Sequence, residues 1–401
     1  MLPLDTAPEK VPSGSNILSS RKSCSGRHIA AARQPDGAFA CARLEESVDC
    51  RRMRRLSCLE KLQKFFQVAS EAAGTRGQIM PKRMLDLNEM TSVKDAARRV
   101  LALRIEAVRD RIADALSPGE ERLQHVHALR VASRRAEAAV DLFESYLPRK
   151  VFKKVRRKLR LIRRVVGTAR DWDVVLALYF ARLKHAEQVD EPAYDMLIGY
   201  ALAHRVPAQL RLEQACPEYL FGFDRLMAST LANIRSRGSK REAFGGYART
   251  LLAQMVGGFT ALCDHDDGEW VQMHRVRIAG KRLRYTLEIV CGCVDAALQT
   301  TLASALVRLQ GTLGVVNDNR NAAHMLEEIL GGLEHCHDAT GSRYRTLLER
   351  QLQECDMLMR NGREEYRRWL QQWRSSAMQQ ALNSLHSEAI LHRSMTRDST
   401  A

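Results

Sequence analysis

The feature that most constrains this chain is a basic pattern that occurs twice, 147 positions apart. VHALRVASRR at 126–135 aligns with MHRVRIAGKR at 273–282. At the same offset, GTARD at 167–171 aligns with GVVND at 314–318. A shared register over about 45 residues indicates a duplicated structural unit rather than two chance matches.

The composition predicts an all-α fold. The chain is 45% hydrophobic but only 6% aromatic, and Leu, Ala, Arg and Glu dominate. Apolar residues recur with helical spacing from about residue 88 onward, which favours helix after helix. The expected helices cover 92–116, 118–147, 149–166, 172–187, 192–212, 217–236, 241–263, 269–292, 296–313, 319–332 and 342–375. Ser117 is expected to cap the second helix, Gly167 to end the third, and Asp171 to cap the fourth.

The chain is expected to contain three parts. Residues 1–85 hold five of the ten prolines and predict a disordered or partly helical N-terminal extension. Residues 88–375 carry the repeat as two helical bundles, 88–236 and 240–375, related by an approximate two-fold axis. Residues 376–401 are expected to form a C-terminal tail.

The charge balance indicates a polyanionic partner. The formal net charge is +16, which suits nucleic acid, anionic lipid or a polymer of phosphate. No apolar run approaches the length of a transmembrane helix, so no membrane partner is expected. Ten cysteines without a CxxC motif, and no secretory signal, predict reduced thiols and a cytoplasmic location.

Each copy of the basic pattern forms a ladder along one helix face. Positions i, i+3 and i+7 share a face, and in the first repeat they are His127, Arg130 and Arg134. The second repeat places His274, Arg277 and Lys281 in the same register. An apolar stripe follows another face of the same helix, so each ladder is a continuous polar strip beside the core.

The segment 148–164 holds ten basic residues and no acid, and residues 121–184 hold 17 Lys and Arg against six Asp and Glu. Repulsion of roughly tenths of a kcal/mol per i,i+4 pair accumulates over such a run, which suggests that an external anion supplies the countercharge. A solvated face, with arginine stems covering apolar surface, is the alternative. Repetition of the ladder favours an anion site, because solvation does not require the same positions in both halves.

The sequence predicts neither a metal site nor an enzyme. The ladder histidines are expected to orient the neighbouring arginine when neutral, or to join the anion site when protonated. Asp171, Asp173 and Asp318 are expected to cap helices and pair with arginines. No zinc-like spacing and no P-loop, GxSxG or HExxH motif occurs, so no cofactor is expected.

These motifs together resemble the conserved-histidine α-helical domain family, known as CHAD, over roughly 88–375. The family writes a His-x-x-Arg-x-x-x-[Arg/Lys]-Arg helix in each half. Its turn motifs are matched by Gly167, Arg170, Asp171, Asp173 and Val174 in the first half and by Leu313, Gly314, Asn317 and Asp318 in the second.

The resemblance implies two pseudo-symmetric antiparallel four-helix bundles around a basic central cavity that binds inorganic polyphosphate, and association with polyphosphate granules. The polyphosphate-binding residues expected from these motifs and from the basic run at 148–164 are His127, Arg130, Arg134, Arg135, Lys153, Lys154, Arg156, Arg157, Arg160, Arg163, Arg164, Arg170, His274, Arg277, Lys281, Arg282, Arg284 and Tyr285. CHAD domains are often fused to a triphosphate-tunnel β-barrel. The 85 N-terminal residues are too few and too irregular for one, which removes the usual reason to expect phosphohydrolase activity.

Two alternatives stay open at this point. The basic helices would also suit a nucleic-acid-binding helical protein, although they contain few aromatic residues for stacking on bases. A histidine phosphocarrier that uses His127 or His274, or a polyphosphate hydrolase, is the enzymatic alternative. Because most of the charge lies in the first half, its ladder and 148–164 are expected to bind more strongly than Arg277 and Lys281. The oligomeric state stays open.

Overall fold

The computed structural model describes residues 87–117, 121–235, 242–266, 268–334 and 339–383, together with residues 385 and 387. Across these ranges the regular structure is helical, and the β-structure amounts to one isolated bridge between Ser92 and Ala243. The expected all-α fold is confirmed. The predicted N-terminal extension, 1–85, lies outside the described residues.

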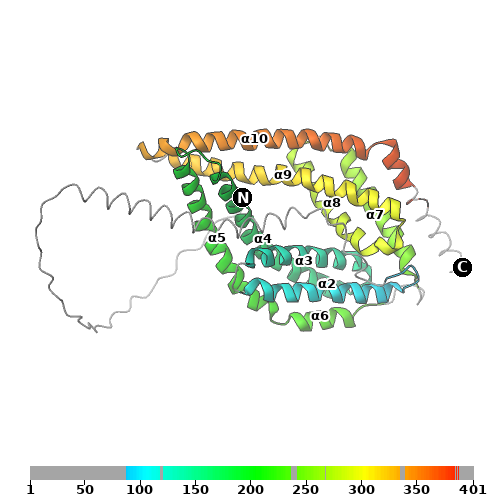
Figure 1. Cartoon of the computed structure of the whole chain (residues 1–401). Helices are drawn as coiled ribbons and strands as arrows, with labels where there is room; N and C mark the ends of the chain where they lie inside the picture. Colours follow the sequence, from blue (N-terminus) through cyan, green and yellow to red (C-terminus); the bar gives the residue numbers. More distant parts are fainter. Residues whose placement is uncertain are drawn as a thin grey trace, which may run out of the picture. The chain divides into compact units, whose positions relative to one another are not determined.

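The helices of the two halves follow the same order (Figure 1). The first half contains α2 (Val93–Leu116), α3 (Arg122–Leu142), α4 (Arg149–Leu183), α5 (Glu191–Leu220) and α6 (Phe223–Ala232). The second half contains α7 (Phe244–Asp264), α8 (Trp270–Val290), α9 (Ala296–Glu334) and α10 (Ala339–Trp373). Short 3₁₀ helices, η2 (Glu144–Tyr146) and η3 (Cys291–Cys293), follow α3 and α8 and begin 147 positions apart.

Two of the expected helix breaks are wrong. The α4 helix continues through Gly167, and α9 continues through Gly314, so neither repeated motif forms a turn. A glycine costs a helix only about 1 kcal/mol, and the buried stripe of α4 continues past it through Ala169 and Leu176. Asp171 therefore lies inside α4 and caps no helix.

Three other expectations about helix ends also fail. The α3 helix begins at Arg122 after Glu121, while Ser117 is the C-terminal cap of α2. The expected break between the helices 192–212 and 217–236 is wrong, because α5 continues through both Pro207 and Pro217. Residues 376–383 form a further stretch of helix, and Leu382 and Leu385 are buried in the core, so the packed chain extends into the segment expected to be a tail.

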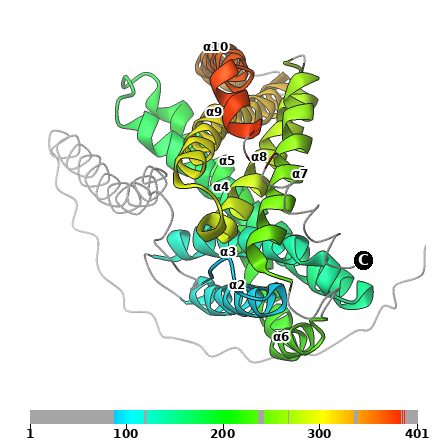
Figure 2. The same ribbon diagram turned by 90° about the vertical axis from the view of Figure 1, so that its right-hand side faces the viewer.

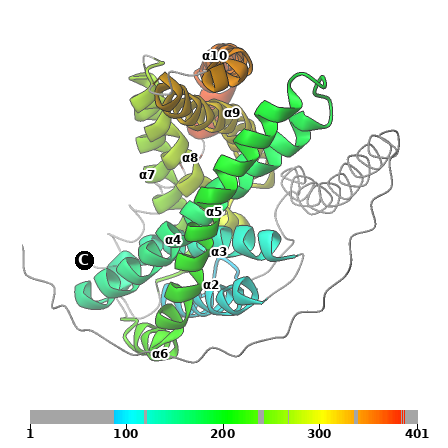
Figure 3. The same cartoon turned by 90° about the vertical axis from the view of Figure 1, so that its left-hand side faces the viewer.

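The buried core is not divided between the halves. One apolar cluster takes residues from α2 and α3 as well as from α7, α8, α9 and α10. A second cluster joins the C-terminal part of α4 and the start of α5 to α9 and α10. Long antiparallel pairs build the frame, with α9 against α10 and α4 against α5 (Figures 2 and 3). The two predicted bundles thus share their interior.

The two repeats are joined by reciprocal ion pairs between α3 and α8. Arg135 on α3 donates to Glu288 on α8 through Nε and Nη2, at 2.8 and 3.1 Å. Arg282 on α8 donates to Asp141 on α3 at 3.0 Å. Arg135 and Arg282 are 147 positions apart, as are Asp141 and Glu288, so each repeat offers the same arginine and the same acid to its neighbour. Reciprocity of this kind is typical of a two-fold contact.

The starts of the two halves also meet in space. The backbone N–H of Val93 donates to the carbonyl of Glu242 at 3.0 Å, and the N–H of Phe244 donates to the carbonyl of Thr91 at 2.7 Å. These bonds tie the first turn of α2 to the first turn of α7. The two halves therefore begin side by side. The next helix of each half, α3 and α8, contacts the other.

Replacement of Glu288 by alanine should lower the free energy of unfolding by about 3–5 kcal/mol, because it leaves buried arginines without a countercharge. The Glu288 and Arg104 side chains are each only 7% exposed, and the two lie 3.6 Å apart. Chemical denaturation followed by circular dichroism measures the change. Glu349→Ala is the matched control, since Glu349 is 50% exposed in its pair with Arg345 and should contribute less than about 1 kcal/mol. Equal small losses in both variants would contradict the importance of the pair.

Candidate anion-binding site

A cavity of about 500 Å³ lies where α3, α4, α8 and α9 meet. Its basic lining residues come from three of these helices and from both repeats. They are Arg130 and Arg134 on α3, Arg156, Arg160 and Arg163 on α4, and Arg277, Lys281 and Arg282 on α8, with His274 beside them. The α9 helix adds Asn317, Asp318 and Asn321. The two ladders therefore converge on one partly open cavity.

Two further hollows adjoin this cavity. One, of about 330 Å³, shares Arg134 and Lys281 with it and adds His127, Arg170 and Arg284. The other, of about 460 Å³, follows the outer face of α4 and shares Arg156 and Arg160. Because each hollow shares lining residues with the cavity, the three form a connected basic surface.

The structure brings 16 of the 18 predicted site residues to these hollows. The central cavity and the first adjoining hollow hold the residues of both ladders together with Arg170, Arg284 and Tyr285, and the α4 groove holds Lys153, Arg157 and Arg164. Arg135 and Lys154 line none of the three. Arg135 is instead taken by Glu288, and Lys154 lies exposed on α4. The sequence pattern does not distinguish these two residues from the neighbouring basic residues that line a hollow.

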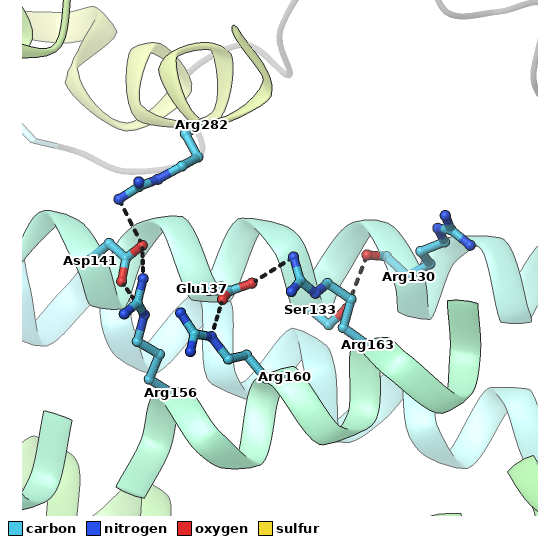
Figure 4. Close-up of polar contacts among 8 residues, drawn as sticks. All are labelled: Arg130, Ser133, Glu137, Asp141, Arg156, Arg160, Arg163 and Arg282. Carbon is cyan, nitrogen blue, oxygen red and sulfur yellow. Dashed lines mark hydrogen bonds and ion pairs between the residues drawn. The ribbon is translucent and has the colours of Figure 1, made fainter. Parts of the chain in front are cut away.

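Two acids on α3 hold four arginines at the side of the cavity, as Figure 4 shows. Glu137 accepts from Arg160 at 3.1 Å and pairs with Arg163 at 3.2 Å. Asp141 pairs with Arg156 at 2.9 Å and with Arg282 at 3.0 Å. Both carboxylates are 12% exposed. Part of the positive charge at the cavity is therefore already neutralised by the protein.

Burial raises the pKa of Asp141, and the neighbouring Arg156 and Arg282 offset this rise in part.

The two acids, Glu137 and Asp141, could have been found in the sequence. Glu137 and Asp141 lie seven positions after Arg130 and Arg134, on the face that carries the ladder. Which arginines they hold could not be predicted, because the partners come from α4 and α8.

Arg130 is fixed by two contacts with α4. Its Nη1 atom donates to the carbonyl of Gly167 at 2.9 Å and to Asp171 Oδ1 at 2.8 Å. The expectation that Asp171 pairs with an arginine is confirmed. Asp173 likewise accepts from Arg205 at 2.7 Å, but this buried pair lies outside the three hollows. The repeated Gly-x-x-x-Asp motif thus supplies helix-face partners instead of a turn.

The centre of the cavity holds cations that crowd one another. Burial, followed by the charges of Arg277, Arg134 and Arg130, lowers the pKa of Lys281 to about 6, and Asp318 offsets this only in part. Burial and Arg130 likewise lower the pKa of Arg134 to about 10. The buried Nε atom of Arg134 has no hydrogen-bond partner among the described residues. An anion placed here would relieve both the repulsion and the missing hydrogen bond.

The imidazole of His274 belongs to the same cluster. Burial lowers its pKa, and the charges of Arg277, Lys281 and Arg320 lower it further. Its buried Nδ1 atom lacks a hydrogen-bond partner in the part of the chain that the structure describes. The His274 ring lies 5.6 Å from that of Trp270, over which the Arg320 guanidinium is placed at 4.3 Å. The neutral form of His274 is therefore favoured.

Comparison with known proteins agrees with this architecture. The model of the CHAD domain matches residues 99–327, more than half of the chain. This chain therefore belongs to the CHAD domain family. No curated protein matches the sequence.

Solved structures with the same fold include the CHAD domain from the plant Ricinus communis. It is 22% identical, has a TM-score of 0.53, and the match covers 70% of this chain and 95% of the plant domain. PptA from Streptomyces chartreusis is 15% identical with a TM-score of 0.52, and the match covers 68% of this chain and 99% of PptA. At these identities the similarity establishes the fold.

The described residues contain neither a metal-type cluster nor a membrane-spanning helix. No group of three or more His, Cys, Asp or Glu side chains there is arranged to hold a metal ion. None of the described helices combines the length and apolar character that crossing a membrane requires.

The free energy of unfolding of the wild type should increase with pH, and replacement of Lys281 by methionine should make that increase smaller. A lysine pKa lowered from 10.5 to about 6 means that the unfolded chain binds more protons between these values, so stability increases with pH across that window. The buried charge lowers the free energy of unfolding by its full amount below about pH 6, and by less as the pH rises. Thermal unfolding from about pH 6.5 to about pH 9, in buffers without phosphate, measures the slope.

The matched control is Lys153→Met, which removes the same charge from the exposed face of α4. It should keep the wild-type slope, while Lys281→Met should raise the melting temperature most at the acidic end of the range. The interpretation of the cluster is wrong if the two variants show the same pH dependence.

Proposed function

We propose that this protein binds inorganic polyphosphate in the cavity between α3, α4, α8 and α9. The observation that carries the proposal is the convergence of both ladders on one space whose central cations, Arg134 and Lys281, are crowded and poorly neutralised. A phosphate chain supplies repeated negative charge and many acceptor oxygens, which arginine recognises well. The chemistry of the cavity thus matches that of the polymer.

The cavity favours a phosphate polymer over nucleic acid. Single-stranded nucleic acid is usually held by aromatic side chains on which successive bases stack. Among the residues that line the cavity, Tyr285 is the only Phe, Tyr or Trp, and it is 5% exposed beneath the guanidinium of Arg284. A chain without bases requires no such platform. Non-specific contact with nucleic acid at the exposed face of α4 is the second candidate.

Binding is proposed to be non-catalytic. Burial and the surrounding cations disfavour the protonated form of His274, so little imidazolium is present at neutral pH to donate a proton. The carboxylates of Glu137 and Asp141 are each engaged by two arginines, so neither is placed as a free general base. Polyphosphate recovered from the complex should therefore keep its chain length, and neither ladder histidine should carry phosphate. By extension, we place the protein in the cytoplasm, at polyphosphate granules.

Long-chain polyphosphate should bind more tightly than single-stranded DNA of matched charge at the same salt concentration. Titration of both polyanions by fluorescence anisotropy, at two or more salt concentrations, tests the preference. Affinity should fall steeply with salt, because binding releases counterions. Equal or tighter binding of DNA would contradict the proposal.

The double variant Arg134→Gln, Lys281→Met should lose at least about 10-fold in polyphosphate affinity, roughly 1.4 kcal/mol. Neither residue forms an ion pair with an acid among the described residues, so the helical circular-dichroism signal should be retained. Arg211→Gln with Arg225→Gln removes as much charge from exposed positions outside the three hollows and serves as the control. Unchanged affinity in the cavity variant would place the site elsewhere.

A further inference from the structure

The outer face of α4 carries a second basic stripe that the cavity does not use. Lys153, Arg157 and Arg164 are exposed and line the groove on that face. Residues 153 and 164 are separated by about 16 Å along the helix axis at 1.5 Å per residue. Phe152 and Leu161 form the apolar floor between these side chains. The face is therefore a strip of exposed cations over a small apolar base.

The groove and the cavity meet at Arg156 and Arg160, which line both. The Arg156 guanidinium lies 5.5 Å from the ring centre of Phe152 in the groove and also pairs with Asp141 in the cavity. Arg160 similarly pairs with Glu137. These two arginines form the rim over which a chain would pass from one space to the other.

The acids that neutralise the rim do not reach the outer stripe. Among the described residues, Lys153, Arg157 and Arg164 form no ion pair with an acid, and no acid lines the groove. A solvated face is the ordinary explanation for such a run of charge. What distinguishes this one is that it shares Arg156 and Arg160 with a basic cavity, so that a polymer leaving the cavity meets the stripe directly.

We propose that the outer groove of α4 is an exit subsite for the part of a phosphate chain that extends beyond the cavity, so that the protein distinguishes phosphate chains by length. This inference rests on the proposed function. A short oligomer would occupy the cavity alone, where the crowded cations are. A long chain would continue over Arg156 and Arg160 and gain the contacts of Lys153, Arg157 and Arg164.

The test compares tripolyphosphate with long-chain polyphosphate on the whole protein. Lys153→Gln, Arg157→Gln and Arg164→Gln are combined in one variant, and all three positions are exposed. Loss of three exposed charge contacts should weaken long-chain binding about 10-fold, while tripolyphosphate affinity should stay within about 2-fold of the wild type. The slope of log Kd against log salt should also become shallower for the long chain alone.

The control variant removes three exposed charges from α10, Arg360→Gln, Arg367→Gln and Arg368→Gln, none of which lines a hollow. It should leave the ratio of the two affinities unchanged, which separates local contact from loss of overall charge. Unchanged long-chain binding in the α4 variant, or an equal loss for both ligands, would overturn the exit subsite while leaving the cavity proposal intact. Failure of the wild type to bind either ligand would overturn both.

Discussion

The structure depends on a pair of reciprocal ion pairs between the two repeats. Arg135 holds Glu288, and Arg282 holds Asp141, so that α3 and α8 are fixed face to face. Each ladder lies on the same helix as one of these arginines and one of these acids. Once the helices are locked in this way, Arg130, Arg134, Arg277 and Lys281 face the same space. A duplicated sequence thereby becomes one site.

The protein divides its positive charge into two classes. Glu137 and Asp141 neutralise the arginines at the side of the cavity. At the centre, burial and neighbouring cations lower the pKa values of Arg134 and Lys281. The count of charges in the sequence suggested that the first ladder and 148–164 bind most strongly. We propose instead that the centre, which includes Lys281, contributes most to binding, because those cations gain most when an anion arrives. Repulsion between these cations destabilises the folded state, and the buried ion pairs around the cavity offset it.

Much of the fold could be predicted from periodicity, because the 147-residue offset aligns helices, ladders and the reciprocal pairs alike. The breaks at Gly167 and Gly314 were wrong because burial along α4 and α9 outweighs the small helix penalty of one glycine. The expected break after residue 212 was also wrong, since α5 continues through Pro217. The convergence of 16 predicted residues on connected hollows could be expected from the ladders. The exclusion of Arg135 from the hollows could not be predicted, because its partner, Glu288, lies 153 positions away.

A polyanion among Arg134, Arg277 and Lys281 would favour the charged form of that lysine, whose pKa burial and the neighbouring cations lower to about 6. Binding near neutral pH should therefore take up protons from solution. Isothermal titration calorimetry with long-chain polyphosphate, in buffers of different ionisation enthalpy at about pH 7.5, measures this uptake directly. Uptake of up to about one proton per bound chain is predicted for the wild type and little for Lys281→Met. Binding by the wild type without proton uptake would contradict a polyanion seated at the centre of the cavity.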